Sequence, residues 1–437
     1  MLHNQWLRIM SGIVPKLAAA ALMAVMLSLS AAPARSFESA AANDTARFLA
    51  GMPPAPTSPL AALTSDPRWQ QHARRFDALF GREESAKLSK IRAFSQERLT
   101  EKHDTLLYMF GGPDFLYATT FFPNDSTYVL AGLEQIGDVP PLTNFTHATI
   151  DQTLQGLEGS LGTILNISFF ITKNMKTQLY VGPVYGTLPI LYVFLARTGK
   201  TIRDVSFVGL DEAGNFVSPG VKSASRGVKI VFSDESGTNK TLYYFSTNLA
   251  DDSIGRTGFL QFCAKLGPAD SFIKSASYLL QTGRFNKVRN FLLEQSATIL
   301  QDDTGIPIAY FNPKVWRFQA FGRYVGPLNI SGATYQARMG ELFRNAIPID
   351  FGVGYRWRPN ESNLVLAEKV ASASNDSALA PYLLSDRYPR TAGGSRERHP
   401  PGKRAQSEPK AEPGSVLGCG LRSVFSFCSD SETKTNQ

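Results

Sequence analysis

Cysteine is scarce in this chain, which limits the scaffolds and sites it can build. Only Cys263, Cys419 and Cys428 occur in 437 residues. Cys263 lies in an apolar segment, where a free cysteine usually packs as a small hydrophobe. Cys419 and Cys428 are near enough in sequence to close a small loop under oxidising conditions. With so few cysteines, a disulfide scaffold is excluded.

The sequence also lacks the signatures of several common sites. The histidines between residues 37 and 370 are His72, His103 and His147, and none belongs to an H-E-x-x-H or Cys/His pattern. We therefore expect no metal site. G-x-G-x-x-G and G-x-S-x-G are missing as well, which argues against a dinucleotide cofactor and against a serine nucleophile elbow. We expect no cofactor.

Charge of one sign is not concentrated in the main part of the chain. The formal net charge is +8, of which +3 lies in residues 1–36 and +2 in residues 371–437. The remaining +3 is spread over residues 37–370 and is weak for a body of that length. We expect no nucleic-acid partner. Hydrophobic residues, at 43%, are sufficient for a packed core.

No apolar run is long enough to span a membrane. The charge-free run Leu17–Ala32 is shorter than the roughly 20 residues that a spanning helix needs. Arg8 and Lys16 precede it, and Ala32-Pro33-Ala34 follows as the small-x-small pattern that signal peptidase accepts. We predict a bacterial secretory signal peptide over residues 1–36, cleaved after Ala34 or Ser36. The mature protein would be periplasmic or extracellular, with no membrane span.

Changes in composition divide the rest of the chain. Residues 37–64 are Ala/Pro-rich and predict a flexible linker, and residues 65–103 predict a helical extension. Asp66 and Pro67 should begin its first helix, and Gly81 should end it. Residues 104–370 form the body. Residues 371–437 are rich in Pro, Ser, Gly and Arg and predict a disordered tail.

The body has the pattern of an α/β fold. Two apolar strands, Thr105–Phe110 and Thr127–Leu133, flank a short helix at Phe115–Phe122. This order is typical of parallel pairing. Gly227–Ser233 and Thr241–Thr247 predict an antiparallel hairpin. We therefore predict a layered, mainly parallel sheet with one antiparallel hairpin.

Three further segments of the body have sequence patterns that predict secondary structure. We predict a helix over Asp270–Gln281 and short strands over Ile306–Phe311 and Ile349–Trp357.

The strongest candidate site follows the first strand of the body. Gly111-Gly112-Pro113-Asp114 connects that strand to its helix, and Glu134 follows the second strand. Ligands of parallel α/β sheets bind at the carboxyl ends of strands, where glycines allow close approach. Asp114 and Glu134 are therefore candidate catalytic residues, with Gly111 and Gly112 as ligand-binding positions. A purely structural tight turn is the alternative interpretation.

Two pairs of adjacent aspartates are further candidates. Asp302 and Asp303 follow a strand-like run and could act as general acid and base, and Asp251-Asp252 has the same form. Aspartates also cap helices and begin turns, which is the structural alternative.

Aromatic and arginine side chains gather near residue 320. Trp316, Arg317 and Arg323 belong to this cluster. Such side chains stack on sugars and hold anions in bidentate fashion, and they also build cores. They are candidate ligand-binding residues for a small polar ligand or an envelope polymer.

Three stretches resemble a family of exported bacterial proteins that has no assigned activity: Tyr108–Pro123, Ser296–Asp303 and Gly354–Glu361. The resemblance covers roughly residues 104–369 and implies export, but it transfers no catalytic residue.

The sequence leaves two functions open. The first is a cofactor-independent hydrolase of an envelope or extracellular substrate, with Asp114 as the acid/base. The alternative is a non-enzymatic, envelope-associated protein that binds a ligand or partner. A shared pocket for Asp114, Glu134 and Asp302-Asp303 would favour the hydrolase.

Overall fold

A computed structural model describes residues 39–101, 103–139, 145–170, 184–218, 223–330 and 332–370. The expected signal peptide, the expected tail, Cys419 and Cys428 lie outside the described residues. The helices are α3 (Ser39–Leu49), α4 (Pro67–Glu83), α5 (Ser89–Arg98), α6 (Phe115–Phe121), α7 (Ile150–Ile167), α9 (Leu188–Arg197), α10 (Asp251–Ile254), α11 (Phe259–Lys265), α12 (Asn286–Gln295) and α13 (Ala337–Leu342). The strands are β1 (Thr105–Tyr108), β2 (Thr127–Gly132), β3 (Thr201–Leu210), β4 (Phe216–Val217), β5 (Ser225–Ser233), β6 (Asn239–Ser246), β7 (Ala269–Ile273), β8 (Ser296–Gln301), β9 (Trp316–Gly322) and β10 (Asn363–Lys369).

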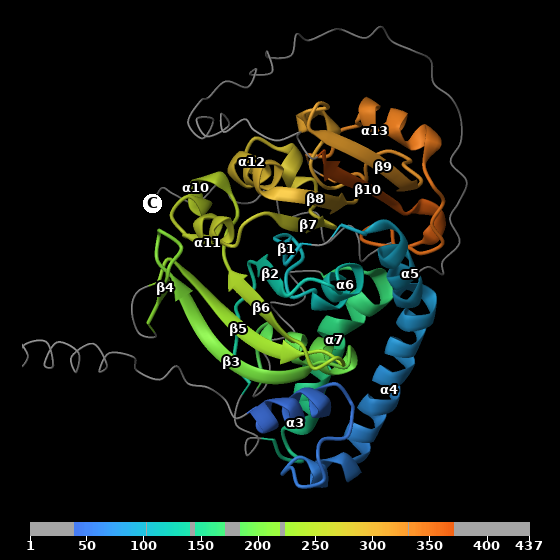
Figure 1. Cartoon of the computed structure of the whole chain (residues 1–437). Helices are drawn as coiled ribbons and strands as arrows, with labels where there is room; N and C mark the ends of the chain where they lie inside the picture. Colours follow the sequence, from blue (N-terminus) through green and yellow to red (C-terminus); the bar gives the residue numbers. More distant parts are fainter. Residues whose placement is uncertain are drawn as a thin grey trace, which may run out of the picture. The chain divides into compact units, whose positions relative to one another are not determined.

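All ten strands belong to one sheet, in the order β4-β3-β5-β6-β2-β1-β7-β8-β10-β9 (Figure 1). The five central strands, from β6 to β8, are parallel to one another. Antiparallel pairs flank them, with β3, β4 and β5 on one side and β10 on the other. The α/β class, the parallel core and the β5–β6 hairpin are confirmed. Antiparallel pairing extends further than the sequence indicated.

Helices cover both faces of the central strands. Leu106 and Tyr108 of β1 pack into a core that includes residues of α3 to α9, whereas Leu107 belongs to a second core with residues of α11 and α12. Alternate residues of a strand point to opposite faces, so a strand between two helical layers must be apolar throughout. That requirement explains the uninterrupted apolar run of β1.

The chain leaves the centre of the sheet in two directions. From β1 it passes through α6 to β2 on one side, and from β7 it passes through α12 to β8 on the other. Because α6 and α12 pack on opposite faces, the connections diverge between β1 and β7. In open α/β sheets such a switch point leaves a crevice at the carboxyl ends of the strands.

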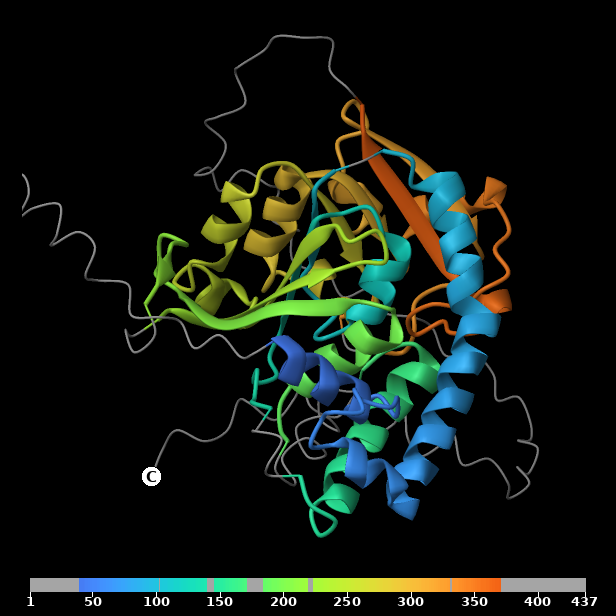
Figure 2. The same ribbon diagram turned by 60° about the horizontal axis from the view of Figure 1, so that its bottom comes forward.

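The segment predicted as a flexible linker is instead part of the core. α3 spans Ser39–Leu49 and packs on α9 and β3 (Figure 2). Phe48 and Leu49 are fully buried, and the Phe48 ring stacks on Trp69 of α4. The prediction failed because it followed the alanine and proline content and gave no weight to these apolar side chains.

The helical extension begins as predicted but does not break where predicted. Asp66 caps α4, its carboxylate accepting a hydrogen bond from the Arg68 amide at 2.9 Å. Gly81 does not end the helix, which continues through a π-helical turn at Glu84–Leu88 into α5. A β-carbon on Gly81 would meet no atom within 4 Å. A glycine in so open a position weakens a helix without breaking it.

Three other assignments were wrong. Residues of the predicted helix Asp270–Gln281 form β7 and a short 3₁₀ turn at Leu279–Gln281. Ile306–Phe311 contains a 3₁₀ turn, and Ile349–Trp357 forms only an isolated bridge, Val353 to Arg356. In the last two cases a short apolar run could not separate strand from buried turn, because both can be buried. In the first, the polar residues Asp270 and Ser271 interrupt the apolar pattern that is typical of a buried strand.

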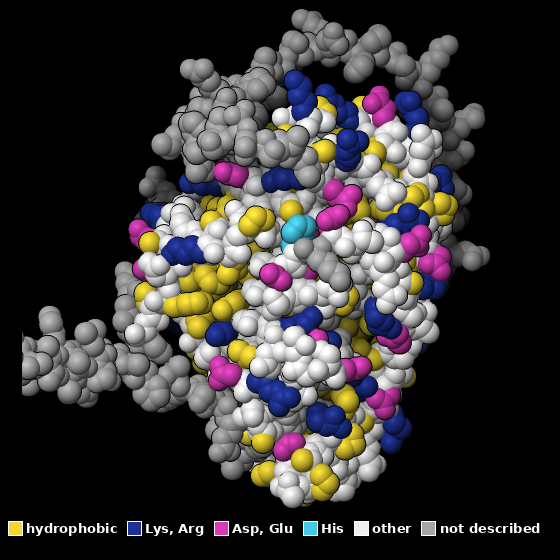
Figure 3. Space-filling model, in the orientation of Figure 1, with side chains coloured by type: hydrophobic (Ala, Val, Ile, Leu, Met, Phe, Trp, Pro, Cys, Tyr) yellow, Lys and Arg dark blue, Asp and Glu magenta, His cyan; other side chains and the backbone are white. Residues whose placement is uncertain are grey.

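Within the described ranges, no helix is both long and apolar enough to cross a membrane. On the face shown in Figure 3, basic and acidic side chains are interspersed.

We predict that Phe48→Ala lowers the free energy of unfolding by about 3–5 kcal/mol, because it leaves a cavity between α3 and α4. Phe216→Ala is the matched control, since that ring is 50% exposed, and it should cost much less. Denaturant unfolding measures both. Equal, small effects would show that α3 contributes nothing to the fold.

Candidate functional site

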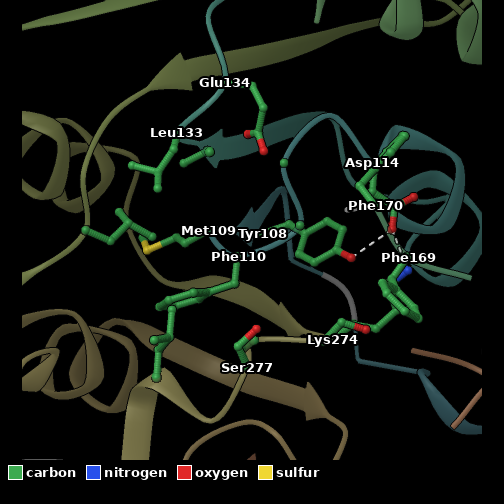
Figure 4. Close-up of a pocket in the computed structure, with 18 of the residues that line it drawn as sticks. Tyr108, Met109, Phe110, Asp114, Leu133, Glu134, Phe169, Phe170, Lys274 and Ser277 are labelled. Carbon is green, nitrogen blue, oxygen red and sulfur yellow. Dashed lines mark hydrogen bonds and ion pairs between the residues drawn. The ribbon is translucent and has the colours of Figure 1, made fainter. Parts of the chain in front are cut away.

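A cavity of about 200 Å³ lies at the switch point (Figure 4). Its walls include residues 108–112 after β1, 131–134 at the end of β2, 247–249 after β6 and 274–277 after β7. Phe169, Phe170, Phe285 and Tyr355 also contribute. The parallel strands thus bring four distant segments to one place. Gly111, Gly112, Asp114 and Glu134, the strand-end residues that the sequence pointed to, all belong to this lining; their role in binding or catalysis stays a prediction.

Glu134 places a carboxylate at one side of the cavity. Its side chain is buried, and Oε2 lies 3.3 Å from the hydroxyl of Tyr244, which also donates to the Glu134 backbone carbonyl at 2.9 Å. A β-carbon on Gly132 would lie 2.3 Å from Oε2, and one on Gly112 would lie 3.6 Å from it. Glycine at position 132 is therefore needed to make room for this carboxylate.

Asp114 also belongs to the cavity lining, but it is buried and both of its carboxylate oxygens have partners within the protein. One oxygen caps α6 by accepting the Tyr117 amide at 3.1 Å. The other accepts the Tyr108 hydroxyl at 2.8 Å and lies 2.7 Å from Nζ of Lys274. Both oxygens of this carboxylate therefore already have partners within the protein, a cation among them, which leaves it little capacity to contact a ligand.

Lys274 is the partner that the sequence interpretation missed. Its side chain is 1% exposed, and Nζ also donates to the Ser168 carbonyl at 2.5 Å and lies 3.9 Å from the centre of the Tyr117 ring. Burial lowers the pKa of Lys274, and Asp114 acts in the opposite direction. The ion pair offsets the cost of burying this ammonium group.

A second buried ion pair supports the first. Lys87, in the π-helical turn, lies 3.1 Å from Glu83 of α4. Glu83 accepts the Tyr117 hydroxyl at 2.5 Å, and Ser168 donates its hydroxyl to that of Tyr117. The helical extension is thus joined to the cavity wall by polar contacts as well as by apolar packing.

Backbone strain is concentrated around the cavity. The non-glycine residues with positive φ in the described ranges are Ser168, Ser275, Ser277 and Tyr278. Ser275 and Ser277 line the cavity, Tyr278 follows them, and Ser168 accepts the hydrogen bond from Lys274. Such conformations cost on the order of 1–3 kcal/mol each and cluster at functional sites.

Asp302 and Asp303 hold this strained loop and do not line the cavity. Asp302 accepts the Ser275 amide at 2.8 Å, and Asp303 accepts the Tyr278 hydroxyl at 2.8 Å. Burial, with the neighbouring Asp303 charge, raises the pKa of Asp302 to about 7. Their hydrogen bonds with the loop argue for a supporting role, not the predicted catalytic one.

The other candidates lie away from the cavity. Trp316 is buried in the core beside Phe311, while Arg317 and Arg323 are exposed on and just after β9. None of the three lines the cavity. Asp251 caps α12 by accepting the amides of Asn286 and Lys287, which agrees with the structural alternative.

A sequence signal for Lys274 did exist, but it suggested the wrong chemistry. Ser271-Phe272-Ile273-Lys274 matches S-x-x-K, in which a serine and a lysine act together. Here Ser271 lies within β7 and its hydroxyl contacts that of Ser296 at 2.7 Å. Lys274 lies just after the strand and pairs with Asp114, so the two side chains have different partners and form no serine–lysine pair.

Comparison with protein-family models, curated proteins and solved structures finds no match for this chain. The resemblance suggested by the sequence therefore stays a prediction. Within the described ranges, no group of three or more His, Cys, Asp or Glu side chains is arranged to hold a metal ion. The site has to be interpreted from its own geometry.

We predict that Lys274→Met lowers the free energy of unfolding by about 3–5 kcal/mol, because it leaves the Asp114 charge buried without a partner. Asp114→Asn keeps the cap on α6 and should cost a similar amount. The double variant should cost less than the sum of the two, since it removes both charges. Denaturant unfolding gives the three values.

Lys90→Met provides the control. Lys90 pairs with Asp350 at 3.1 Å, but both side chains are exposed, so its loss should change stability by less than about 1 kcal/mol. Strict additivity of the two cavity substitutions would contradict the proposed coupling.

Proposed function

We propose that this chain is an exported protein that binds a small organic molecule in the cavity between β1 and β7. The observation that carries the proposal is the cavity itself, with its position at the topological switch point and its mixed lining. Small-molecule sites are concave and mostly apolar, with a few polar groups that fix the orientation of the ligand. The walls here combine Phe110, Phe169 and Phe285 with Glu134 and Ser277.

The strained loop supports the same conclusion. Ser275 and Ser277 have positive φ values of 55° and 51°, although glycine would adopt this conformation at lower cost. The Ser275 hydroxyl oxygen is buried and has no hydrogen-bond partner in the described part of the chain. Buried polar atoms are nearly always paired, and a ligand in the adjoining cavity would supply a partner.

The hydrolase that the sequence suggested has less support. It needs two carboxylates that can exchange protons in one pocket. Asp114 is held by Lys274 and Tyr108, and Asp302 and Asp303 are held by the loop behind the cavity. Of the two described carboxylates that line the cavity, Asp114 and Glu134, only Glu134 has no cationic partner within the described residues (Figure 4). We therefore favour binding, which the sequence left as the alternative.

Export belongs to the proposal because of the first 36 residues. The charged start, the short apolar run and Ala32-Pro33-Ala34 are typical of a signal peptide. α3, where the described fold begins, starts at Ser39. Cleavage after Ala34 or Ser36 would remove no part of that fold.

We predict that fragment-sized ligands bind to the mature protein and that Leu133→Trp weakens their binding at least about tenfold. Leu133 lines the cavity and is 56% exposed, so a larger side chain there can obstruct the opening without disturbing the core. Val325→Trp is the matched control, because Val325 is 48% exposed and lies outside the lining. Thermal shift and ligand-detected NMR measure binding. Fragments that bind both variants equally well would place their site elsewhere.

We predict that the full chain, expressed in a bacterial host with a general secretion pathway, is recovered outside the cytoplasm with its N-terminus at Arg35 or Phe37. Intact-mass measurement of each cell fraction tests this. Replacing Ala32 and Ala34 by Asp should leave the leader attached, because signal peptidase requires small residues there. Uncleaved protein confined to the cytoplasm would refute export.

A further inference from the structure

We infer that the ligand of the cavity is an organic monocation, whose positively charged nitrogen binds the carboxylate of Glu134. The inference rests on the proposed binding function and adds the chemical class of the ligand. It rests on the charge of the groups that line the cavity and on the space that Gly132 leaves for the Glu134 carboxylate.

Glu134 lacks a cationic partner in the described part of the chain. It accepts hydrogen bonds from the neutral hydroxyl of Tyr244, and no described Lys, Arg or His forms an ion pair with it. The residue is 7% exposed. Buried charges in proteins are usually paired, so this carboxylate is suited to a cation that the ligand brings.

The remaining charges on the cavity wall cancel. Asp114 and Lys274 form an ion pair at 2.7 Å, with both side chains 1% exposed. Together they contribute no net charge. By formal charge, Glu134 therefore leaves the lining at −1, and a ligand with a single positive charge would complement it.

The walls suit the rest of such a molecule. Phe110, Phe169 and Phe170 line the cavity with Met109. Aromatic faces attract cations as well as apolar groups, and a thioether packs well against an aromatic ring. An apolar cavity of about 150 Å³ holds benzene. A cavity of about 200 Å³ accommodates a slightly larger molecule, such as a ring with a short aminoalkyl chain.

The positions of the labelled groups fix the direction of binding. In Figure 4, Glu134 lies on one side of the cavity and Ser277 on the other, with the ring of Tyr108 between them. Ser277 shares a hydrogen bond of 2.6 Å with Tyr355. A cation at Glu134 would therefore direct the body of the ligand past Tyr108 toward the strained loop.

A series of probes of nearly equal shape tests the charge preference. We would titrate the mature protein at pH 7 with 2-phenylethylamine, 2-phenylethanol and phenylacetate, which carry charges of +1, 0 and −1. We expect the amine to bind at least about tenfold more tightly than the alcohol, because it forms a charge-assisted hydrogen bond with Glu134. Phenylacetate should bind most weakly.

Variants of two glutamates make the test specific. Glu134→Gln keeps the shape and the hydrogen-bonding capacity of the side chain but removes its charge, so the amine should fall to the affinity of the alcohol. Glu212→Gln is the control, since Glu212 is exposed and lies outside the cavity lining. Thermal unfolding of each variant shows whether the fold is intact.

The outcomes separate this inference from the function on which it rests. Equal binding of amine and alcohol, or tighter binding of phenylacetate, would overturn the charge preference and leave the binding function standing. Amine binding that Glu134→Gln does not weaken would also overturn it. Failure of all three probes, together with failure of the fragment screen, would overturn both.

Discussion

The ion pair between Lys274 and Asp114 is the contact on which the centre of this molecule depends. It joins the end of β7 to the start of α6, 160 residues earlier in the chain, and Lys274 also reaches the last residue before the wall segment Phe169–Phe170. Both charges are withdrawn from water, so neither can lose its partner cheaply. The pair therefore fixes the spacing between two strands whose connections diverge at this point.

Around this contact, each buried carboxylate stabilises a different part of the structure. Asp302 and Asp303 hold the loop after β7, and Glu83 with Lys87 anchors Tyr117 from the side of the long helix. All of these carboxylates have donors within the protein. Among the described residues, Glu134 differs in degree, because one hydroxyl donates to its carboxylate and glycines leave space beside it. That contrast between occupied and available carboxylates is the physical basis for proposing a binding site.

The sequence predicted those parts of the structure that depend on local pattern. β1 and β2 were recognisable because strands covered on both faces are apolar throughout, and Asp114 and Glu134 followed from their places after those strands. β7 was taken for a helix because Ala269–Ile273 contains polar residues that the core pairs with distant partners. The role of Lys274 was also missed, because its partner Asp114 is distant in sequence. The two side chains come together only in the folded sheet, and no local sequence pattern predicts such a contact.

The π-helical turn at Glu84–Leu88 has a consequence for how the long helix can vary. An α-helix advances about 100° per residue, and a π-turn accommodates one extra residue within an otherwise continuous helix. Trp69 and Phe76 before the turn, and Ile91 and Phe94 after it, all face the core. The π-turn therefore absorbs the extra residue locally, and both amphipathic halves keep their apolar faces on the core. Loss of one residue is best tolerated at this turn, whereas the same loss within α4 or α5 would rotate one apolar face away from the core.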